Sequence, residues 1–280
     1  MSDTPTLAFL MRRLEASASG APAPDAVATG FPSLDQLLSG GIRKGDLALI
    51  AGDAGSGKSA LALAMAVRAA SSGRNVSYLS AESTPDRLVE RAIAMEGRFS
   101  IDDLRKGRLD EEARIRAANS IQELRNGLPE FGLIPEPRPE SVAGELRRAL
   151  DLEFAVVDGI GGMSAGERPR EEEFAWAIAS MKRLALELGI ALLVTVPLVR
   201  PVTGRDDPRP MLDDLGALGA AKDSPDLVLG LFREEMYHAV KVGIEGAAEL
   251  MLLKNRNGPV GYVDLYFYSR WMRFEDMLEH

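Results

Sequence analysis

The segment that most constrains this chain is residues 52–59, Gly-Asp-Ala-Gly-Ser-Gly-Lys-Ser, which fits the pattern G-x-x-x-x-G-K-[ST] at every position. An apolar run precedes it and an alanine-rich helical stretch follows, so the loop joins a strand to a helix as the pattern requires. Glycines let the backbone wrap closely around phosphate oxygens, which the N–H groups of the loop and of the helix N-terminus then face. The residues predicted to bind a nucleotide phosphate are Gly52, Ala54, Gly55, Ser56, Gly57, Lys58, Ser59 and Ala60.

Strands and helices alternate over most of the chain. The runs with the composition of strands buried on both faces of a parallel sheet are residues 47–51, 76–81, 154–158 and 191–198. The helical stretches are residues 60–70, 110–125 and 174–188. This alternation predicts an α/β fold with a mainly parallel, twisted sheet flanked by helices. Residues 248–254 and 262–268, separated by Asn-Arg-Asn-Gly-Pro, predict an antiparallel hairpin at the sheet edge. We find no internal repeat, which excludes a duplicated two-domain ATPase.

The N-terminal segment differs from the rest of the chain. Helical spacing places Leu7, Leu10, Met11 and Leu14 on one face, and residues 16–24, rich in Ala, Ser, Gly and Pro, predict a linker. We therefore predict an amphipathic helix with a flexible tether at 1–28 and a folded domain at 29–280. The apolar stripe must be buried, and the pattern leaves open whether its own domain or a neighbouring subunit covers it.

Composition excludes several classes of protein. With 280 residues, 46% hydrophobic and 27% charged, the chain has ordinary globular usage. It has no cysteine and two histidines, which excludes a cysteine-ligated zinc and argues against a histidine-based metal site. The longest apolar run, 190–199, is too short for a bilayer and no signal peptide is visible, so we expect a cytoplasmic protein without membrane contact. The net charge of −9 argues against non-specific coating of nucleic acid, though not against a few arginines in a channel.

Two carboxylates follow predicted strands. Asp158 ends one strand about a hundred residues after Lys58, where it would hold Mg²⁺ together with the Ser59 hydroxyl, while Lys58 reaches the β and γ phosphates. Glu82 follows another strand in Leu-Ser-Ala-Glu-Ser, where it would orient or deprotonate the attacking water. ATP and Mg²⁺ are the expected cofactors. The alternative for each residue is a purely structural role: Asp158 would only cap the end of its strand, and Glu82 would only lie next to the N-terminus of the following helix.

Several further segments resemble a known family. Residues 29–35, Thr-Gly-Phe-Pro-Ser-Leu-Asp, followed by Gly-Asp-Leu at 45–47 and the phosphate loop, are similar to the RecA-like ATPases, which include DnaB-type replicative helicases and KaiC- and RadA-like proteins. The segments that resemble the DnaB-type motor domain in particular are residues 101–109, 209–215, 226–228, 232–237 and 254–261. The resemblance extends from about Thr29 to Asp276.

This resemblance implies a RecA-like fold in a homo-oligomeric ring, usually of six subunits, with ATP at each subunit boundary and single-stranded DNA as a possible partner. Lys254 and Arg256 match the family's basic pair that reaches the neighbour's γ phosphate. Residues i and i+2 of a strand share a face, so both cations can approach one phosphate. Charges that protect a strand edge from aggregation are the alternative. The N-terminal helix matches the family's linker helix, which packs on the adjacent motor domain.

The chain also departs from the family's pattern. Pro197 stands where the family has a glutamine, and because proline cannot donate a hydrogen bond the usual contact with the γ phosphate is missing, although Arg200 remains. Residues 216–219, Gly-Ala-Leu-Gly, replace the pore loop's Arg-Glu-Ser-Gly, and Lys222 replaces an acidic residue. The remaining cations that could face DNA, each with a solvated loop position as the alternative, are Arg168, Arg170, Arg205, Arg209 and Lys222.

Two hypotheses about function follow. The leading one is a ring-forming ATP-hydrolysing motor that resembles the DnaB-type helicase C-terminal domain. The alternative is a nucleotide-switched regulatory or assembly ATPase of the KaiC-like kind, without unwinding. The acidic balance, Pro197 and Gly216 favour the second, and the C-terminal segments favour the first. Stimulation of ATP hydrolysis by DNA distinguishes them.

Overall fold

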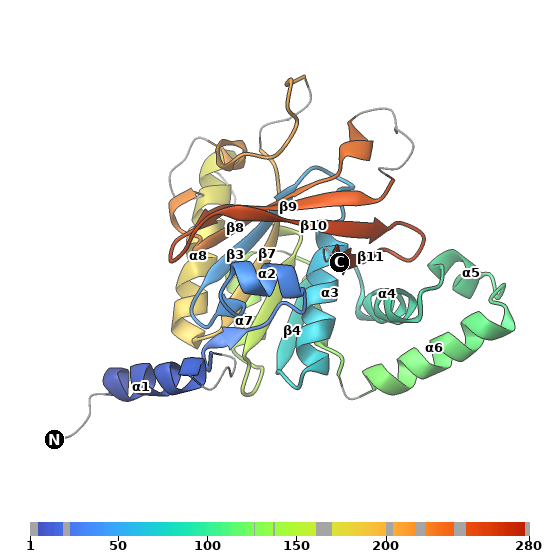
Figure 1. Cartoon of the computed structure of the whole chain (residues 1–280), viewed down its shortest axis with the longest axis horizontal. Helices are drawn as coiled ribbons and strands as arrows, with labels where there is room; N and C mark the ends of the chain where they lie inside the picture. Colours follow the sequence, from blue (N-terminus) through green and yellow to red (C-terminus); the bar gives the residue numbers. More distant parts are fainter. Residues whose placement is uncertain are drawn as a thin grey trace.

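The structure, a computed structural model, describes residues 5–18, 23–125, 127–136, 138–160, 170–199, 204–216, 222–237 and 245–277. These residues build an α/β fold around a nine-stranded sheet (Figure 1). In spatial order its strands are β11 (Arg273–Asp276), β10 (Gly261–Tyr268), β9 (Ala247–Asn255), β8 (Leu227–Phe232), β3 (Leu47–Gly52), β7 (Ala191–Pro197), β6 (Phe154–Asp158), β4 (Val76–Ser80) and β5 (Glu130–Leu133). A separate two-stranded sheet pairs β1 (Ala26–Val27) with β2 (Ile42–Arg43).

The helices lie between these strands along the chain. They are α1 (Pro5–Ala18), α2 (Pro32–Leu37), α3 (Lys58–Ser71), α4 (Pro85–Gly97), α5 (Ile101–Arg105), α6 (Glu111–Leu124), α7 (Pro139–Leu146) and α8 (Arg170–Leu188), with 3₁₀ turns η2 (Leu212–Leu215) and η3 (Glu234–Met236). No helix in the described ranges combines the length and the apolar character needed to cross a membrane.

The predicted mainly parallel sheet is confirmed. From β8 through β3, β7, β6 and β4 to β5, every neighbouring pair is parallel, and all six residues of β3 are buried. Side chains of β3 alternate between the two faces of the sheet. Ala48 and Ile50 pack in the core beneath α3, whereas Leu47 and Leu49 pack in the core beneath α7 and α8. Burial on both faces explains why the parallel strands are continuous apolar runs in the sequence.

The C-terminal hairpin forms as predicted, but the prediction that it lies at the sheet edge is wrong. Strands β9 and β10 pair antiparallel, and β11 adds outside β10 as the edge strand. Four residues with a single inward aromatic side chain, Phe274, carry too little periodicity to be recognised as a strand. The N-terminal helix also continues to Ala18, three residues into the segment predicted as linker.

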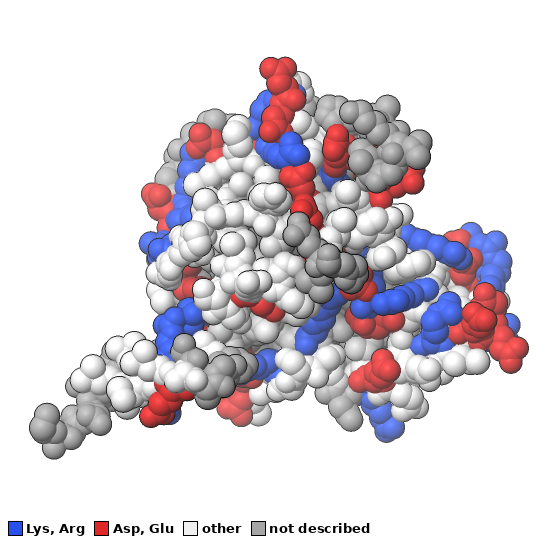
Figure 2. All heavy atoms as spheres, in the orientation of Figure 1, with Lys and Arg blue, Asp and Glu red and all other residues white. Residues whose placement is uncertain are grey.

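Helix α1 leaves its apolar stripe uncovered. It extends from the body of the molecule at the lower left of Figure 1. The exposed fractions of Leu7, Leu10, Met11 and Leu14 are 55%, 44%, 57% and 65%. Uncharged atoms dominate the α1 surface in Figure 2, where basic and acidic side chains are interspersed over the rest of the face shown. The chain's own domain therefore does not bury this stripe.

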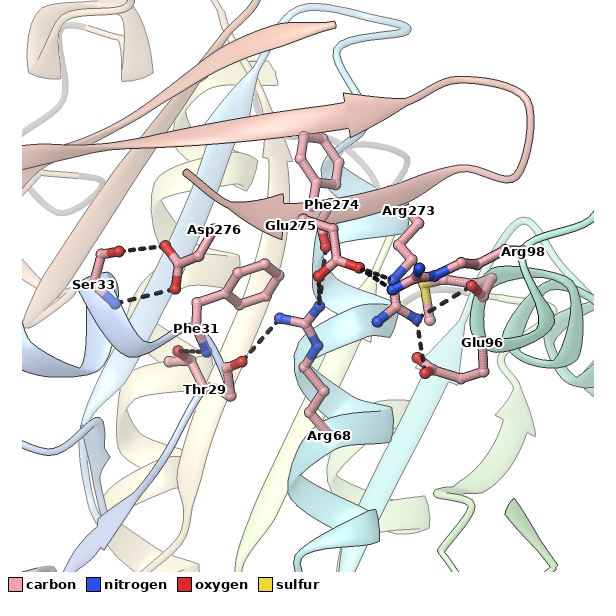
Figure 3. A network of polar contacts seen from close by, with 12 residues as sticks. Thr29, Phe31, Ser33, Arg68, Glu96, Arg98, Arg273, Phe274, Glu275 and Asp276 are labelled. Carbon is pink, nitrogen blue, oxygen red and sulfur yellow. Dashed lines mark hydrogen bonds and ion pairs between the residues drawn. The ribbon is translucent and has the colours of Figure 1, made fainter. Parts of the chain in front are cut away.

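A polar network joins the N-terminal segment, helix α3 and the last strand (Figure 3). Its centre is Arg68 of α3, whose guanidinium donates to the carbonyl of Gly30 at 2.8 Å and to that of Phe274 at 3.0 Å. The same guanidinium lies 4.0 Å from the centre of the Phe31 ring and forms an ion pair with Glu275 at 3.3 Å. One side chain thus ties together three segments that are distant in sequence.

The rest of the network fixes both ends of β11. Arg273 pairs with Glu275 and, at 2.7 Å, with Glu96 near the end of α4. At the other end the Asp276 carboxylate accepts from the backbone N–H of Ser33 at 3.1 Å and from the hydroxyl of the same serine. These contacts hold β11 against α4 and α2, and the Arg68 contacts hold it against α3, the helix that follows the phosphate loop (Figure 3).

Replacement of Arg68 by alanine is expected to lower the free energy of unfolding by about 3 kcal/mol, because it leaves two partly buried carbonyls without their donor and removes an ion pair of Glu275. Arg98→Ala is the matched control. Arg98 contacts the same Glu275 but its side chain is 61% exposed, so less than about 1 kcal/mol is expected. Chemical denaturation monitored by tryptophan fluorescence gives both values. Equal losses in the two variants would contradict the central role of Arg68.

Candidate nucleotide-binding site

A cleft of about 730 Å³ opens where the parallel strands end. Strands β3, β6 and β7 end at Gly52, Asp158 and Pro197, and the chain reaches Glu82 shortly after β4. This is the edge of an open α/β sheet at which ligands bind. The cleft is lined by the phosphate loop, by Glu82, Asp158, Thr195 and Pro197, and by Arg91, Arg233, Phe267 and Met272.

Glycines shape the loop because neighbouring atoms leave no room for a side chain. Gly57 caps α3 with a φ of 102°, and a Cβ there would lie 2.9 Å from the Phe274 ring. A Cβ on Gly52 would lie 2.7 Å from the hydroxyl of Ser56. The edge strand β11 therefore packs directly on the loop and helps to fix its curvature.

Lys58 is folded onto its own loop. Its Nζ donates to the carbonyls of Gly52 at 2.9 Å and Asp53 at 2.8 Å. Burial lowers the pKa of Lys58, and the nearby carboxylates of Asp158, Asp53 and Glu82 oppose that shift. A phosphate group in the cleft would replace the two carbonyls as acceptor and would stabilise the charged form of the amine.

The predicted metal ligands Ser59 and Asp158 are in contact. The Ser59 hydroxyl donates to Asp158 Oδ1 at 2.8 Å, and the Thr195 hydroxyl donates to the same oxygen at 2.6 Å. Thr195 in turn accepts from the N–H of Gly159 at 3.0 Å. Burial, followed by the charge of Asp158, raises the pKa of the neighbouring Tyr78 hydroxyl. Asp158 is 3% exposed, so its carboxylate is held in one orientation.

Sequence reasoning missed Thr195. The signal was a single hydroxyl residue within an otherwise apolar run that forms a buried strand, and β7 buries Thr195 to 3% exposure. A buried hydroxyl needs a hydrogen-bond partner, and the closing carboxylate of the adjacent strand supplies it.

Glu82 lines the same cleft as Asp158. It is exposed and lines the cleft, and its backbone N–H donates to the Ser80 hydroxyl at 3.2 Å. A Cβ placed on Gly159, directly after Asp158, would come within 3.4 Å of the Glu82 side chain. The Glu82 carboxylate is thus near the metal-ligand pair and open to water.

Arg233 lines the cleft directly after β8, and Tyr237 contacts the phosphate loop; the sequence assigned neither residue a role. The Arg233 guanidinium lies 4.3 Å from the centre of the Phe267 ring and donates to Glu235 through Nε at 3.0 Å. The Tyr237 hydroxyl donates to Asp53 Oδ2 at 2.6 Å, and burial together with this carboxylate raises the pKa of the tyrosine. Arg233 also donates through Nη1 to the carbonyl of Gly55 at 3.3 Å, so this contact and the Tyr237–Asp53 hydrogen bond tie residues 233–237 to the phosphate loop.

The site fits the phosphates of a nucleotide and Mg²⁺. The Ser56 hydroxyl is buried in the loop without a hydrogen-bond partner among the described residues. The hydroxyl of Ser59 and the carboxylate of Asp158 are the hard oxygen ligands that Mg²⁺ prefers. The first backbone N–H groups of α3 have no partner within the helix and can donate to a phosphate.

Lys254 and Arg256 lie away from this cleft. Their side chains meet at the carbonyl of Asp223, which accepts from Lys254 Nζ at 3.0 Å and from Arg256 Nη2 at 2.5 Å. Arg256 Nε also pairs with Asp226, whose backbone contacts Leu47 at the first residue of β3. At about 3.3 Å per residue, β3 separates this end of the sheet from the phosphate loop by roughly 16 Å. The two side chains share one location, although Arg256 lies just beyond the end of β9 and not on the same strand as Lys254, and they cannot reach their own phosphate loop.

The cations considered for DNA have acidic partners wherever the structure describes them. Lys222 pairs with Asp213 and Arg205 with Asp214, each at 2.5 Å, and Arg209 pairs with Glu249 at 2.6 Å. Arg168, Arg200 and residues 217–219 lie outside the described residues, and so does the side chain of Arg170. Pro197 stands opposite Gly52 in the parallel ladder, directly beside the phosphate loop.

The family model of the DnaB-like helicase C-terminal domain matches residues 26–276 of the chain. The chain belongs to this family. It is 30% identical to the replicative DNA helicase DnaB of Geobacillus stearothermophilus and 28% identical to the replicative DNA helicase DnaC of Bacillus subtilis. Each match covers 90% of this chain and 56% of the relative, so the chain spans about half the length of these curated relatives.

The chain also has the same fold as two solved structures. The ATPase domain of G40P superposes with a TM-score of 0.87 at 22% identity, and the match covers 99% of this chain and 100% of that one. A DnaB-like replicative helicase, solved in a study of its interactions with primase, also gives a TM-score of 0.87 at 22% identity and covers 99% of this chain and 68% of that one. The predicted RecA-like fold and the predicted resemblance to the DnaB-type family are both confirmed.

Lys58→Ala is expected to abolish ATP–Mg²⁺ binding. The loop carbonyls hold the charged amine of Lys58 where a phosphate would bind, and the substitution removes this charge. Isothermal titration calorimetry measures the affinity. Lys106→Ala, at the exposed position directly after α5, is the control and should bind ATP as the parent does. Unchanged affinity in Lys58→Ala would exclude the loop as the phosphate site.

Proposed function

We propose that this chain is the ATP-hydrolysing motor domain of a ring-forming DnaB-type DNA helicase, with nucleotide bound at subunit boundaries. The observation that carries the proposal is the cleft in which Lys58, the Ser59–Asp158 contact and Glu82 converge. Membership in the DnaB-like helicase C-terminal domain family supports it. The relatives covered over about half their length are replicative DNA helicases by name.

Each residue of the cleft has a distinct role in this proposal. Lys58 and the N–H groups of the loop bind the β and γ phosphates. Ser59 and Asp158 would hold Mg²⁺, which neutralises phosphate charge when bound, and Thr195 fixes the Asp158 carboxylate. Glu82 orients the attacking water and accepts its proton, because its carboxylate is exposed within the cleft.

A neighbouring subunit completes the site. Lys254 and Arg256 are cations at the opposite end of β3 from their own phosphate loop, and the Arg256 side chain is 47% exposed. Such a pair can stabilise charge on a γ phosphate if that phosphate belongs to the next subunit. The exposed stripe of α1 supplies a second intersubunit contact, in which helix 5–18 packs on the adjacent copy. Six subunits is the ring size that the sequence resemblance implies.

The KaiC-like alternative gains no support from the comparisons, since the curated relatives reported above are replicative helicases. Two local observations still limit the coupling to DNA. Gly216, with a φ of 101°, begins the segment that lacks the family's pore-loop arginine, and Arg205, Arg209 and Lys222 are already paired with carboxylates. We therefore propose that single-stranded DNA binds weakly in this motor.

Deletion of residues 1–20 is expected to shrink the particle measured by mass photometry, because it removes the exposed apolar stripe. Leu10→Asp with Leu14→Asp should act in the same way, since each charge lies on that stripe. Arg12→Ala, also exposed on α1, is the matched control and should leave the oligomer unchanged. An unaltered particle in both stripe variants would show that α1 does not join subunits.

Arg256→Ala is expected to bind ATP nearly as well as the parent and to hydrolyse it about 10³-fold more slowly, as for other arginines that stabilise a transferring phosphoryl group. Glu82→Gln should show the same phenotype from inside the subunit. In mixed rings some boundaries pair an intact Glu82 with an intact Arg256 of the next subunit, so mixing the two variants should restore partial activity. No recovery would exclude a trans role for Arg256.

The same ATPase assay tests coupling to DNA. Single-stranded DNA added to the parent should stimulate hydrolysis weakly, and salt should abolish the effect. Strong stimulation would show that cations other than the three already paired bind DNA. Complete indifference to DNA, together with activity restored by mixing, would favour the regulatory ATPase.

A further inference from the structure

Arg256 and Lys254 are held by one short segment that precedes β8. Lys254 Nζ donates to the carbonyls of Lys222 at 2.5 Å and Asp223 at 3.0 Å, and Arg256 Nη2 donates to the latter at 2.5 Å. The backbone N–H of Arg256 donates to the carbonyl of Asp226 at 2.9 Å. Both cations are therefore fixed by residues 222–226.

The Asp226 carboxylate is the charged member of this arrangement. Its side chain is 4% exposed and pairs with Arg256 Nε through Oδ1 at 2.8 Å. The other oxygen, Oδ2, accepts from Lys182 Nζ at 2.6 Å and from the backbone N–H of Leu47 at 2.9 Å. With α8 and β3 both bound to it, this carboxylate is a rigid anchor for the arginine.

The anchor leaves the far end of the arginine available. Nε is bound to Asp226 and Nη2 to the carbonyl of Asp223, whereas Nη1 makes no hydrogen bond within the described residues. A bulge between Val228 and Leu229 interrupts the β8–β9 ladder just before Lys254 is reached, and β9 ends at Asn255. Bulges re-aim side chains at the ends of a ladder.

We propose that Asp226 is a positioning residue that holds Arg256, with Lys254 beside it, in the orientation needed to reach the phosphate bound by the neighbouring subunit. An arginine fixed through Nε keeps its outer nitrogen in place before the neighbour's nucleotide binds. The side chain therefore does not have to reorganise during hydrolysis. This inference rests on the proposed function, because it requires Arg256 to act in trans.

A purely structural role for Asp226 is the competing explanation. The same residue joins the start of β8 to the start of β3 through its backbone N–H and its carboxylate, and β3 leads to the subunit's own phosphate loop. A structural defect would therefore slow hydrolysis in the subunit that carries the substitution. A positioning defect would slow it in the next subunit.

Asp226→Asn in mixed rings separates these two cases. Alone, the variant should bind ATP with unchanged affinity and hydrolyse it about 10- to 100-fold more slowly, because a misplaced charged group costs rate on this scale. In rings assembled with an excess of Glu82→Gln subunits, each Asp226→Asn subunit receives Arg256 from a neighbour with an intact Asp226. Its rate per subunit should then equal that of parent subunits diluted in the same way. A rate that stays low in the mixture would overturn the inference.

Arg256→Ala diluted into the same excess is the reference. If its rate recovers while that of Asp226→Asn does not, the positioning role is wrong and the trans site stands. If neither recovers, the trans site itself is wrong. Asp46→Asn is the matched control, since Asp46 lies 3.9 Å from Lys182 and makes no hydrogen bond to Arg256, so its rate should stay within about twofold of the parent.

A second variant covers failure of Asp226→Asn to fold. Asp226→Glu keeps the carboxylate for Leu47 and Lys182 but displaces it by one methylene, and it should show the same loss, relieved by dilution. The double variant Asp226→Glu with Arg256→Ala should be no slower than Arg256→Ala alone, because the carboxylate acts through the arginine. An additional loss of tenfold or more in the double variant would overturn the inference.

Discussion

The buried strand β3 is the constraint on which the rest of the molecule depends. Parallel neighbours β7 and β8 fix it on both sides, and its six residues pack into two cores. Its last residue opens the phosphate loop, and its first residue donates to the Asp226 carboxylate that holds Arg256. One rigid strand therefore fixes the positions of the two halves of the proposed site at its opposite ends, and in the proposed motor a complete site requires two copies of the chain.

The edge of the sheet stabilises the loop from outside. Phe274 of β11 occupies the space that a side chain on Gly57 would need, and Arg68 joins β11 to the helix that follows the loop. The same arginine binds the carbonyl of Gly30, near the residues that connect to α1. A displacement of β11 would thus be transmitted to α3, the helix that begins at the phosphate loop.

The sequence was sufficient to predict the features that depend on local residue patterns. Burial on both faces produced the apolar runs, and the phosphate loop has a fixed spacing, so the fold class and the contact of Ser59 with Asp158 could be predicted. Contacts between side chains that are distant in the sequence and meet only in the folded chain could not be predicted. Arg209 and Glu249 are 40 residues apart, and Lys182 and Asp226 are 44, with no periodicity linking them. Residues 273–276 gave no strand signal because their register is set by β10 and by Arg68.

Strand β7 contributes a hydroxyl to the cleft and ends in a residue that has no backbone N–H. Pro197 pairs with Gly52 in the ladder and lacks the N–H that could face a phosphate. Two residues earlier on the same strand, the Thr195 hydroxyl binds the Asp158 carboxylate and the N–H of Gly159. In the proposed motor, β7 therefore acts on the metal ligand rather than on the γ phosphate. In the same proposal, recognition of the γ phosphate depends on Lys58 within the subunit and on Arg256 from its neighbour. Hydrolysis would therefore require that the subunits assemble.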